Sequence, residues 1–299
     1  MQRLLFRISL IIIAIWVGTL VYLTFFPENQ IPDYSKNDGR ISIVATIYPL
    51  AYFAMDLDPI ADVKTIVASG IEPHDYEPTI NDVKVMQDAE LLIINGNIDA
   101  WAERAMNDRR NGPTISVLSL LSLQDSDPHV WLDPVYAEQI VRQIGDQLKY
   151  IDPTRADIIH ENVEKKVATI RSIDVAYRSG LSNCLSKEIV TSHDAFSYLS
   201  KAYDFSAYGV TGINPEEEPS ASAIAELVDL VRVHRITTVF FETLTSDALA
   251  KTIAREAGAK TDVLDPIESL SEGYDAATGY TEIMLDNLEK LSNAMVCHP

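Results

Sequence analysis

DIIHENVEKKVATIRSIDVAYRSGL, residues 157–181, is the stretch that decides how this 299-residue chain is organised. It holds no proline and one glycine, and its apolar residues recur at helical spacing, so it predicts one long helix. On both sides of it, short β-branched runs alternate with helical patterns. Such alternation is typical of α/β folds, and the long helix is therefore expected to connect two α/β lobes.

The strands expected in the first lobe are the runs 41–47, 63–67, 90–96 and 114–118, with a helix over 79–88. Those expected in the second lobe are 188–192, 205–210, 236–241 and 260–264, and a last helix is expected from about 274 to 295. The resulting division is an N-terminal lobe over 40–150, a connecting helix over 151–180 and a C-terminal lobe over 181–299. A binding site is expected in the cleft between the lobes.

The first 39 residues differ in composition from the rest. Arg3 and Arg7 precede an uncharged apolar run from Ile8 to Phe26, which approaches the roughly 20 residues that a helix needs to cross a bilayer. This pattern predicts an uncleaved membrane anchor followed by a polar tether, with the globular part outside the cytoplasm. A cleaved signal peptide is the alternative, although no A-x-A site follows the run.

Charge and cysteine content narrow the possible partners. The net charge of −20 argues against nucleic acid or an anionic membrane surface as a partner. Only two cysteines are present, Cys184 and Cys297. In an oxidising compartment they would form a disulfide, and two free buried thiols are the alternative.

Three histidines and one aspartate form the candidate metal site. His193 and Asp265 each directly follow an expected strand of the second lobe, His74 lies in a loop after a strand of the first lobe, and His129 lies just before a helix. In open α/β sheets, ligands bind outside the carboxyl ends of the strands, so these four side chains are expected to share one cleft. Three imidazoles and a carboxylate suit Zn²⁺, and Mn²⁺ is the second choice.

These residue types also have roles that do not involve a metal. A single histidine in a loop is more often solvated than metal-bound, and only the joint placement of the four favours a metal site. His160, His234 and His298 are expected to be structural or solvated. Asp133 and Asp75 are expected to be caps, and Glu242, which ends a strand, is expected to contact a ligand or to serve as a spare one. No dinucleotide, P-loop or hydrolase-elbow motif is present.

The chain resembles the extracytoplasmic receptors of ABC importers for zinc and manganese, the cluster A-I or ZnuA-like solute-binding proteins. The stretches that carry the resemblance are IVATIYPL (43–50), GIEPHDYEPT (70–79), HVWLDP (129–134), IVTSHDAFSYL (189–199), NPEEEPSASAIAELVDLV (214–231) and VLDPI (263–267). The resemblance implies metal ligands at His74, His129, His193 and Asp265 and two α/β lobes joined by a rigid helix. The His-rich loop that many zinc-specific members have is absent here.

The expected function is capture of Zn²⁺, or alternatively Mn²⁺, and its delivery to the permease of an ABC importer. The protein is expected to be a monomer, to be no enzyme, and to lie in the periplasm or on the outer face of the cytoplasmic membrane. One alternative is a surface-anchored zinc hydrolase with three histidine ligands and Glu242 as base. Another is an adhesin-like protein whose metal is structural.

Overall fold

The computed structural model describes residues 39–103, 109, 111–123, 127–244, 246–270 and 279–298. The expected membrane anchor lies outside these residues. Within them, no helix is both long and apolar enough to span a bilayer.

The first lobe is built on a parallel sheet of strand order β2-β1-β3-β4. Its strands are β1 (Ser42–Ala45), β2 (Asp62–Thr65), β3 (Leu91–Ile94) and β4 (Thr114–Ser116). Because successive side chains in a strand point to opposite faces, Ile43 belongs to the main hydrophobic core and Val44 to a smaller core on the other face. Helices α2 (Tyr48–Leu57) and α6 (Pro134–Ile151) line the main core, and α3 (Ile80–Asp88) lines the smaller one.

The second lobe has the corresponding order, β6-β5-β7-β8, and all its pairings are parallel too. Its strands are β5 (Glu188–Thr191), β6 (Ser206–Gly209), β7 (Thr238–Phe241) and β8 (Lys260–Val263). Here Ile189 faces the main core, whereas Val190 faces a separate core under α9 (Ala221–His234) and α10 (Ala248–Ala257). Helices α8 (Ser197–Ala202) and α11 (Tyr280–Ala294) contribute to the main core. The fold therefore has the two α/β lobes that were expected.

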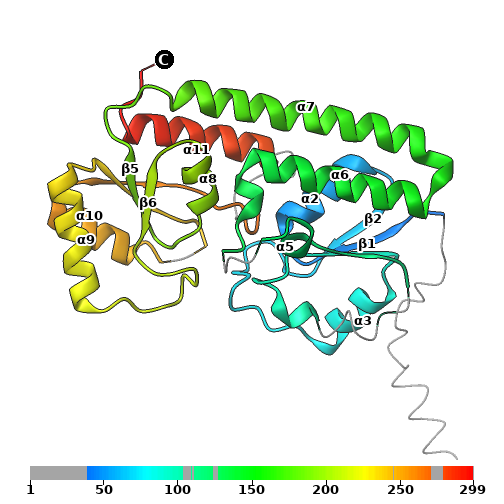
Figure 1. Cartoon of the computed structure of the whole chain (residues 1–299). Coiled ribbons are helices and arrows are strands. Elements are labelled where there is room, and N and C mark those ends of the chain that lie inside the picture. The colour runs from blue at the N-terminus through cyan, green and yellow to red at the C-terminus, as the bar shows by residue number, and fades with distance from the viewer. Residues whose placement is uncertain are drawn as a thin grey trace, which may run out of the picture. The chain divides into compact units, whose positions relative to one another are not determined.

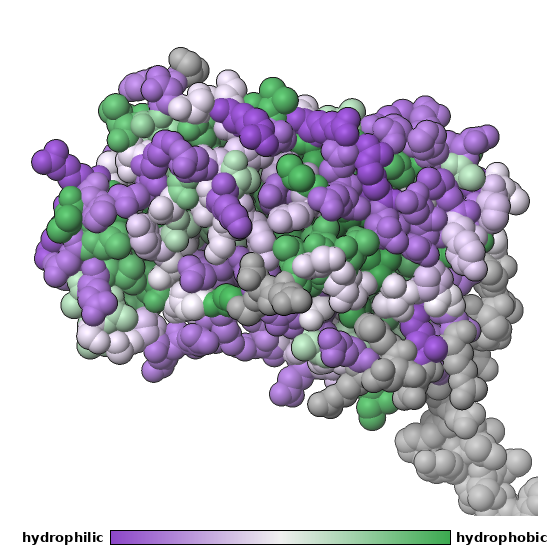
Figure 2. Space-filling view, viewed as in Figure 1, coloured by the Kyte–Doolittle hydropathy of each residue, from purple (hydrophilic) through white to green (hydrophobic). Residues whose placement is uncertain are grey.

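The long helix α7 (Ala156–Gly180) runs along both lobes (Figure 1). A single 3₁₀ turn, η3 (Pro153–Arg155), separates it from α6, and the Arg155 guanidinium pairs with the Asp58 carboxylate at 2.7 and 2.8 Å. The buried apolar side chains of α7, from Ile159 to Tyr177, lie in the same core as residues of both lobes. Its outer face carries mainly hydrophilic side chains along the top of the view (Figure 2).

The remaining short elements are η1 (Ala100–Ala102), α5 (Val117–Leu120) and η2 (Val130–Leu132). Cys184 and Cys297 form a disulfide, as expected, and their backbones also form an isolated antiparallel bridge. This disulfide ties the segment before β5 to the segment after α11. The domain limits given above stay a prediction.

Candidate metal site

Four side chains from distant parts of the chain converge at one point. They are His74, His129, His193 and Glu268, and one potential ligand atom from each lies within 4.8 Å of the others. Three of these residues are the expected histidines. The fourth is a carboxylate three residues beyond the expected Asp265.

Each ligand candidate lies in a loop on the carboxyl side of a sheet. His74 lies between β2 and α3, and His129 directly precedes η2. His193 lies two residues after the end of β5, and Glu268 lies five residues after the end of β8. The cluster thus joins the two lobes, as parallel strands of both sheets direct their following loops to this position.

The cluster is closed to solvent on most sides. His129 and His193 have no exposed surface, Glu268 is 1% exposed, and the His74 side chain is 7% exposed. Glu268 Oε1 lies 2.7 Å from His129 Nε2, 3.2 Å from His193 Nε2 and 3.6 Å from His74 Nε2. Oε2 of Glu268 and Nε2 of His74 are buried and have no hydrogen-bond partner among the described residues. These imidazole nitrogens and the carboxylate oxygens converge on one point and are shielded from water. They fit a single cation with nitrogen and oxygen ligands.

Two further carboxylates fix the orientation of the imidazoles. Asp127 Oδ1 contacts His129 Nδ1 at 2.7 Å, and Glu242 Oε1 contacts His193 Nδ1 at the same distance. The contact of Glu242, which follows β7, agrees with the expectation that it would touch a ligand. Histidines that bind metal usually donate their other ring N–H to a carboxylate, so in both rings Nε2 is the atom left to face the metal.

Asp265, the fourth ligand expected from the sequence, is not among the four residues of the cluster. Its Oδ1 accepts a hydrogen bond from the Ile267 amide at 2.7 Å. The Asp265 amide donates to Oδ1 of Asn287 in α11 at 3.0 Å, and Nδ2 of Asn287 donates to the Asp265 carbonyl at 2.7 Å. Ile267 has φ of 58°, a left-handed conformation that a β-branched residue rarely adopts. The chain therefore turns at Asp265–Ile267 and brings Glu268 to the histidines.

The carboxylates of the cluster favour the protonated forms of His129 and His193 when no metal is bound. Burial would lower the pKa of His193, but the carboxylates of Glu242 and Glu268 outweigh it and raise that pKa to about 11. Burial likewise opposes protonation of His129, but the hydrogen bonds that its ring donates to the carboxylates of Asp127 and Glu268 raise its pKa above the usual value. Glu268 is buried, which alone would raise its pKa, yet contacts with the three histidines hold that pKa well below its usual range.

Glu72 is a buried carboxyl beside the cluster that the sequence reasoning did not single out. Burial and then the charge of Glu268 raise the pKa of Glu72 to about 8, while the His74 amide donates to its Oε1 at 3.1 Å. Asp127 was missed as well, although its place two residues before a proposed ligand, in the run DPH, was an available signal.

The cap expected at Asp133 is confirmed, whereas the residue that caps α3 is Thr79. Asp133 caps α6 by accepting from the Val135 amide at 2.8 Å. The run EEEP (216–219) precedes α9, whose cap is Ser220. His160 is exposed, and the His298 amide donates to the Asn183 carbonyl at 2.9 Å.

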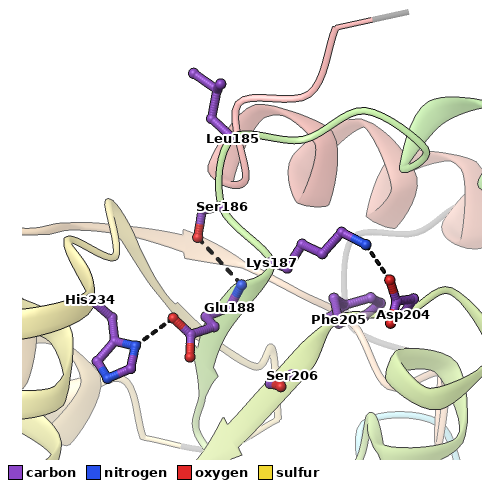
Figure 3. A pocket seen from close by; sticks show the side chains of 8 residues that line it. All are labelled: Leu185, Ser186, Lys187, Glu188, Asp204, Phe205, Ser206 and His234. Atoms are coloured by element: carbon purple, nitrogen blue, oxygen red, sulfur yellow. Dashed lines mark hydrogen bonds and ion pairs between the residues drawn. The ribbon is translucent and has the colours of Figure 1, made fainter.

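His234 lies at the opposite ends of the second lobe's strands from the cluster. Its Nδ1 contacts Glu188 Oε2 at 2.6 Å beside an open hollow of about 430 Å³ (Figure 3). The same hollow is bordered by the exposed ion pair between Lys187 and Asp204. Since Glu188 and Ser206 begin β5 and β6, this hollow is at the amino ends of the strands and is separate from the metal cluster.

The chain is similar to proteins of zinc uptake and zinc binding. The family described as "Zinc-uptake complex component A periplasmic" matches residues 43–294. The zinc-binding lipoprotein AdcA of Streptococcus pneumoniae (strain ATCC BAA-255 / R6) is 34% identical over 278 residues, which cover 85% of this chain and 56% of AdcA. The high-affinity zinc uptake system protein ZnuA of Bacillus subtilis (strain 168) is 32% identical over 286 residues, covering 88% of this chain and 89% of that protein.

Among solved structures, the Zn(II)-bound ZnuA-like domain of Streptococcus pneumoniae AdcA has a TM-score of 0.76 and 36% identity. The match covers 86% of this chain and 99% of that domain. This chain therefore spans about half the length of AdcA, namely the part similar to the ZnuA-like domain.

Proposed function

Because the chain belongs to the ZnuA family of zinc-uptake complex components, we propose that it captures Zn²⁺ outside the cytoplasm and delivers it to the permease of an ABC importer. The observation that carries the proposal is the buried cluster of three imidazoles and one carboxylate. The proposed ligands are Nε2 of His74, His129 and His193 and a carboxylate oxygen of Glu268. Four ligands are the usual number for a zinc site that leaves no position open.

Zinc is favoured over manganese by the donor set. Imidazole nitrogen suits Zn²⁺, whereas Mn²⁺ suits sites that are richer in carboxylate, carbonyl or water oxygen. Mn²⁺ remains the second candidate cargo. Competitive titration of the purified full chain with Zn²⁺ and Mn²⁺ tests this order: we expect one tight zinc site per chain that Mn²⁺ displaces only in large excess. A site that Mn²⁺ fills first would overturn the assignment.

The hydrolase alternative is disfavoured by the position of Glu242. A catalytic zinc keeps a position open for water, next to a base that can take its proton. Glu242 instead contacts Nδ1 of His193, so it is not placed as the base that this alternative names, and Glu268 supplies a fourth donor where the alternative needs water. The family is one of uptake components rather than enzymes. Turnover of ester or peptide substrates by the zinc-loaded chain would contradict this.

We further propose that residues 8–26 anchor the protein in the cytoplasmic membrane, with the two lobes outside the cytoplasm as a monomer. The basic and apolar pattern of the sequence supports the anchor, and the disulfide supports an oxidising compartment. Membrane fractionation of cells that express the full chain tests the anchor. Recovery of all the protein without membranes, at a mass lacking residues 1–26, would instead indicate cleavage.

A further inference from the structure

Trp131 connects the two chain segments that carry His129 and Glu268. It lies two residues after His129, and its indole N–H donates to the carbonyl of Pro266, two residues before Glu268, at 2.8 Å. The Trp131 side chain has no exposed surface. The two segments are thus linked by two contacts a few residues apart: this hydrogen bond and the 2.7 Å contact between His129 and Glu268.

A second bond holds Trp131 from the other side. The hydroxyl of Tyr280, the first residue of α11, donates to the Trp131 carbonyl at 2.6 Å. The Tyr280 ring lies edge-on to Phe53 of α2, with 5.0 Å between the ring centroids. Immediately before it, Gly279 lies so close to Tyr52 that an added Cβ would be 2.2 Å from the Tyr52 hydroxyl oxygen. The start of α11 is therefore packed directly on the first lobe.

The segment around Glu268 has more bonds of this kind. Ser269 Oγ donates to the Ala68 carbonyl at 3.3 Å, and the Gly70 amide donates to the Leu270 carbonyl at 3.0 Å. Residues 266–270 follow a strand of the second lobe, yet on both sides of Glu268 they are hydrogen-bonded to the first lobe. These hydrogen bonds fix the segment that carries Glu268 to the first lobe, which also carries His129.

We propose that Trp131 is a positioning residue that fixes Glu268 relative to His129, so that these two ligands form a rigid pair before the metal arrives. The proposal rests on the metal-binding function proposed above and deepens it. A pair that is already in place loses no conformational freedom when the ion binds, so the ion has only to complete its coordination with His74 and His193.

The first test measures hydrogen exchange of the Trp131 indole N–H by NMR in the full chain. The signal is assigned by its absence in the Trp131→Phe variant. We expect equally slow exchange with zinc bound and after chelation, because the bond to Pro266 does not depend on the metal. Exchange that accelerates by about 100-fold or more on chelation, about 2.7 kcal/mol of lost protection, would overturn the proposal.

The second test compares two variants that each remove one buried hydroxyl. Neither Tyr280 nor Tyr177 has exposed surface. The Tyr280 hydroxyl donates to the Trp131 carbonyl at 2.6 Å, and the Tyr177 hydroxyl donates to the Met284 carbonyl at 2.7 Å. We expect Tyr280→Phe to raise the zinc Kd by about tenfold, within the range of one lost hydrogen bond, and Tyr177→Phe to change it by less than about twofold. Equal effects on Kd, or none in either variant, would overturn the proposal.

These two tests are separable from the test of the proposed function. If the unaltered chain binds no zinc, the proposed function fails, and the exchange rate of the metal-free protein still reports whether the Trp131 bond exists. If the unaltered chain binds zinc tightly but the exchange and Kd results go against Trp131, only the positioning role fails.

Discussion

Two carboxylates three positions apart, Asp265 and Glu268, have different surroundings. Asp265 closes a turn through the Ile267 amide, whereas Glu268 contacts three imidazoles. The turn needs Ile267 at positive φ, which for a β-branched residue costs about 1–2 kcal/mol. Such strain persists only where the surroundings hold it in place, and Asn287 and Trp131 supply the bonds that do so.

A matched pair of amide substitutions separates the roles of these carboxylates. We expect Glu268→Gln to raise the zinc Kd by more than about 100-fold. This is more than the usual effect of removing a residue that is only hydrogen-bonded to a metal ligand. Asp265→Asn keeps an oxygen for the Ile267 amide and is expected to raise Kd by less than about tenfold. Isothermal titration of both variants measures the difference. A larger loss in Asp265→Asn would reinstate the aspartate as the ligand.

The raised pKa values of His129 and His193 give the pH dependence of binding. His193, with a pKa raised to about 11, carries its proton in the metal-free protein throughout the neutral range, so bound zinc must displace it. Affinity is therefore expected to rise with pH from about 6 to 9, by about one logarithmic unit per pH unit for each proton displaced. Calorimetry in buffers of different ionisation enthalpy counts these protons.

The control for that experiment is His193→Ala, which should release at least one proton fewer per zinc and bind more weakly. Zinc binding that releases no proton at pH 7.5, or an affinity that is flat from pH 7.5 to 5.5, would contradict a site with three imidazoles.

Sequence reasoning at the residue scale found the histidines and missed Glu268. His74, His129 and His193 each follow or precede a recognisable strand or helix. That placement directs them to the carboxyl ends of the parallel strands. The position of Glu268 depends on a turn that is held by Asn287, 22 residues after Asp265, and by Trp131 in the other lobe. Local pattern carries no information on such distant bonds.

At the scale of elements, the sequence predicted each of the eight strands in the described part of the chain to within a few residues. Strands buried on both faces are continuous apolar runs, such as Leu91–Ile94, and these are easily recognised in a sequence. The long helix was also predicted, because no glycine or proline interrupts it before Gly180. The beginning of the last helix was expected at about 274, and the structure has α11 from Tyr280, with 271–278 outside the described residues.

The disulfide is expected to stabilise the fold without affecting the metal. It closes a loop across a sequence separation of 113 residues, which corresponds to about 3–5 kcal/mol of stabilisation. The double variant Cys184→Ser and Cys297→Ser should therefore unfold at a lower temperature or denaturant concentration than the unaltered chain. Its zinc Kd should be unchanged, since the cysteines lie near the amino ends of the strands. A large rise in Kd would show that the disulfide also shapes the site.

For the whole molecule, the main feature is that one hydrophobic core extends from the first sheet through α7 to one face of the second sheet. Sequence reasoning gave the two lobes and their connecting helix, because these follow from local periodicity. It did not give the shared core or the bonds across the cleft, because those depend on how the lobes pack.

The shared core predicts that the protein stays folded when the metal is removed. We expect the chelated chain to keep its circular dichroism spectrum and to unfold cooperatively at a lower temperature. Free zinc at about 1,000 times its Kd should add about 4 kcal/mol to the free energy of unfolding. Differential scanning calorimetry measures both states. Loss of folded structure on chelation would instead support the reading of the metal as a structural component.

The near-complete burial of the four proposed ligands has a consequence for which ions can enter. An ion must give up its hydration shell to reach His129 and His193, and imidazole nitrogens must then compensate for the water it has lost. Mg²⁺ dehydrates reluctantly and prefers oxygen in octahedral geometry, so it gains too little from this site to shed its water. We therefore expect Mg²⁺ to bind this site weakly because of the free energy of its dehydration, without a separate filter in the protein.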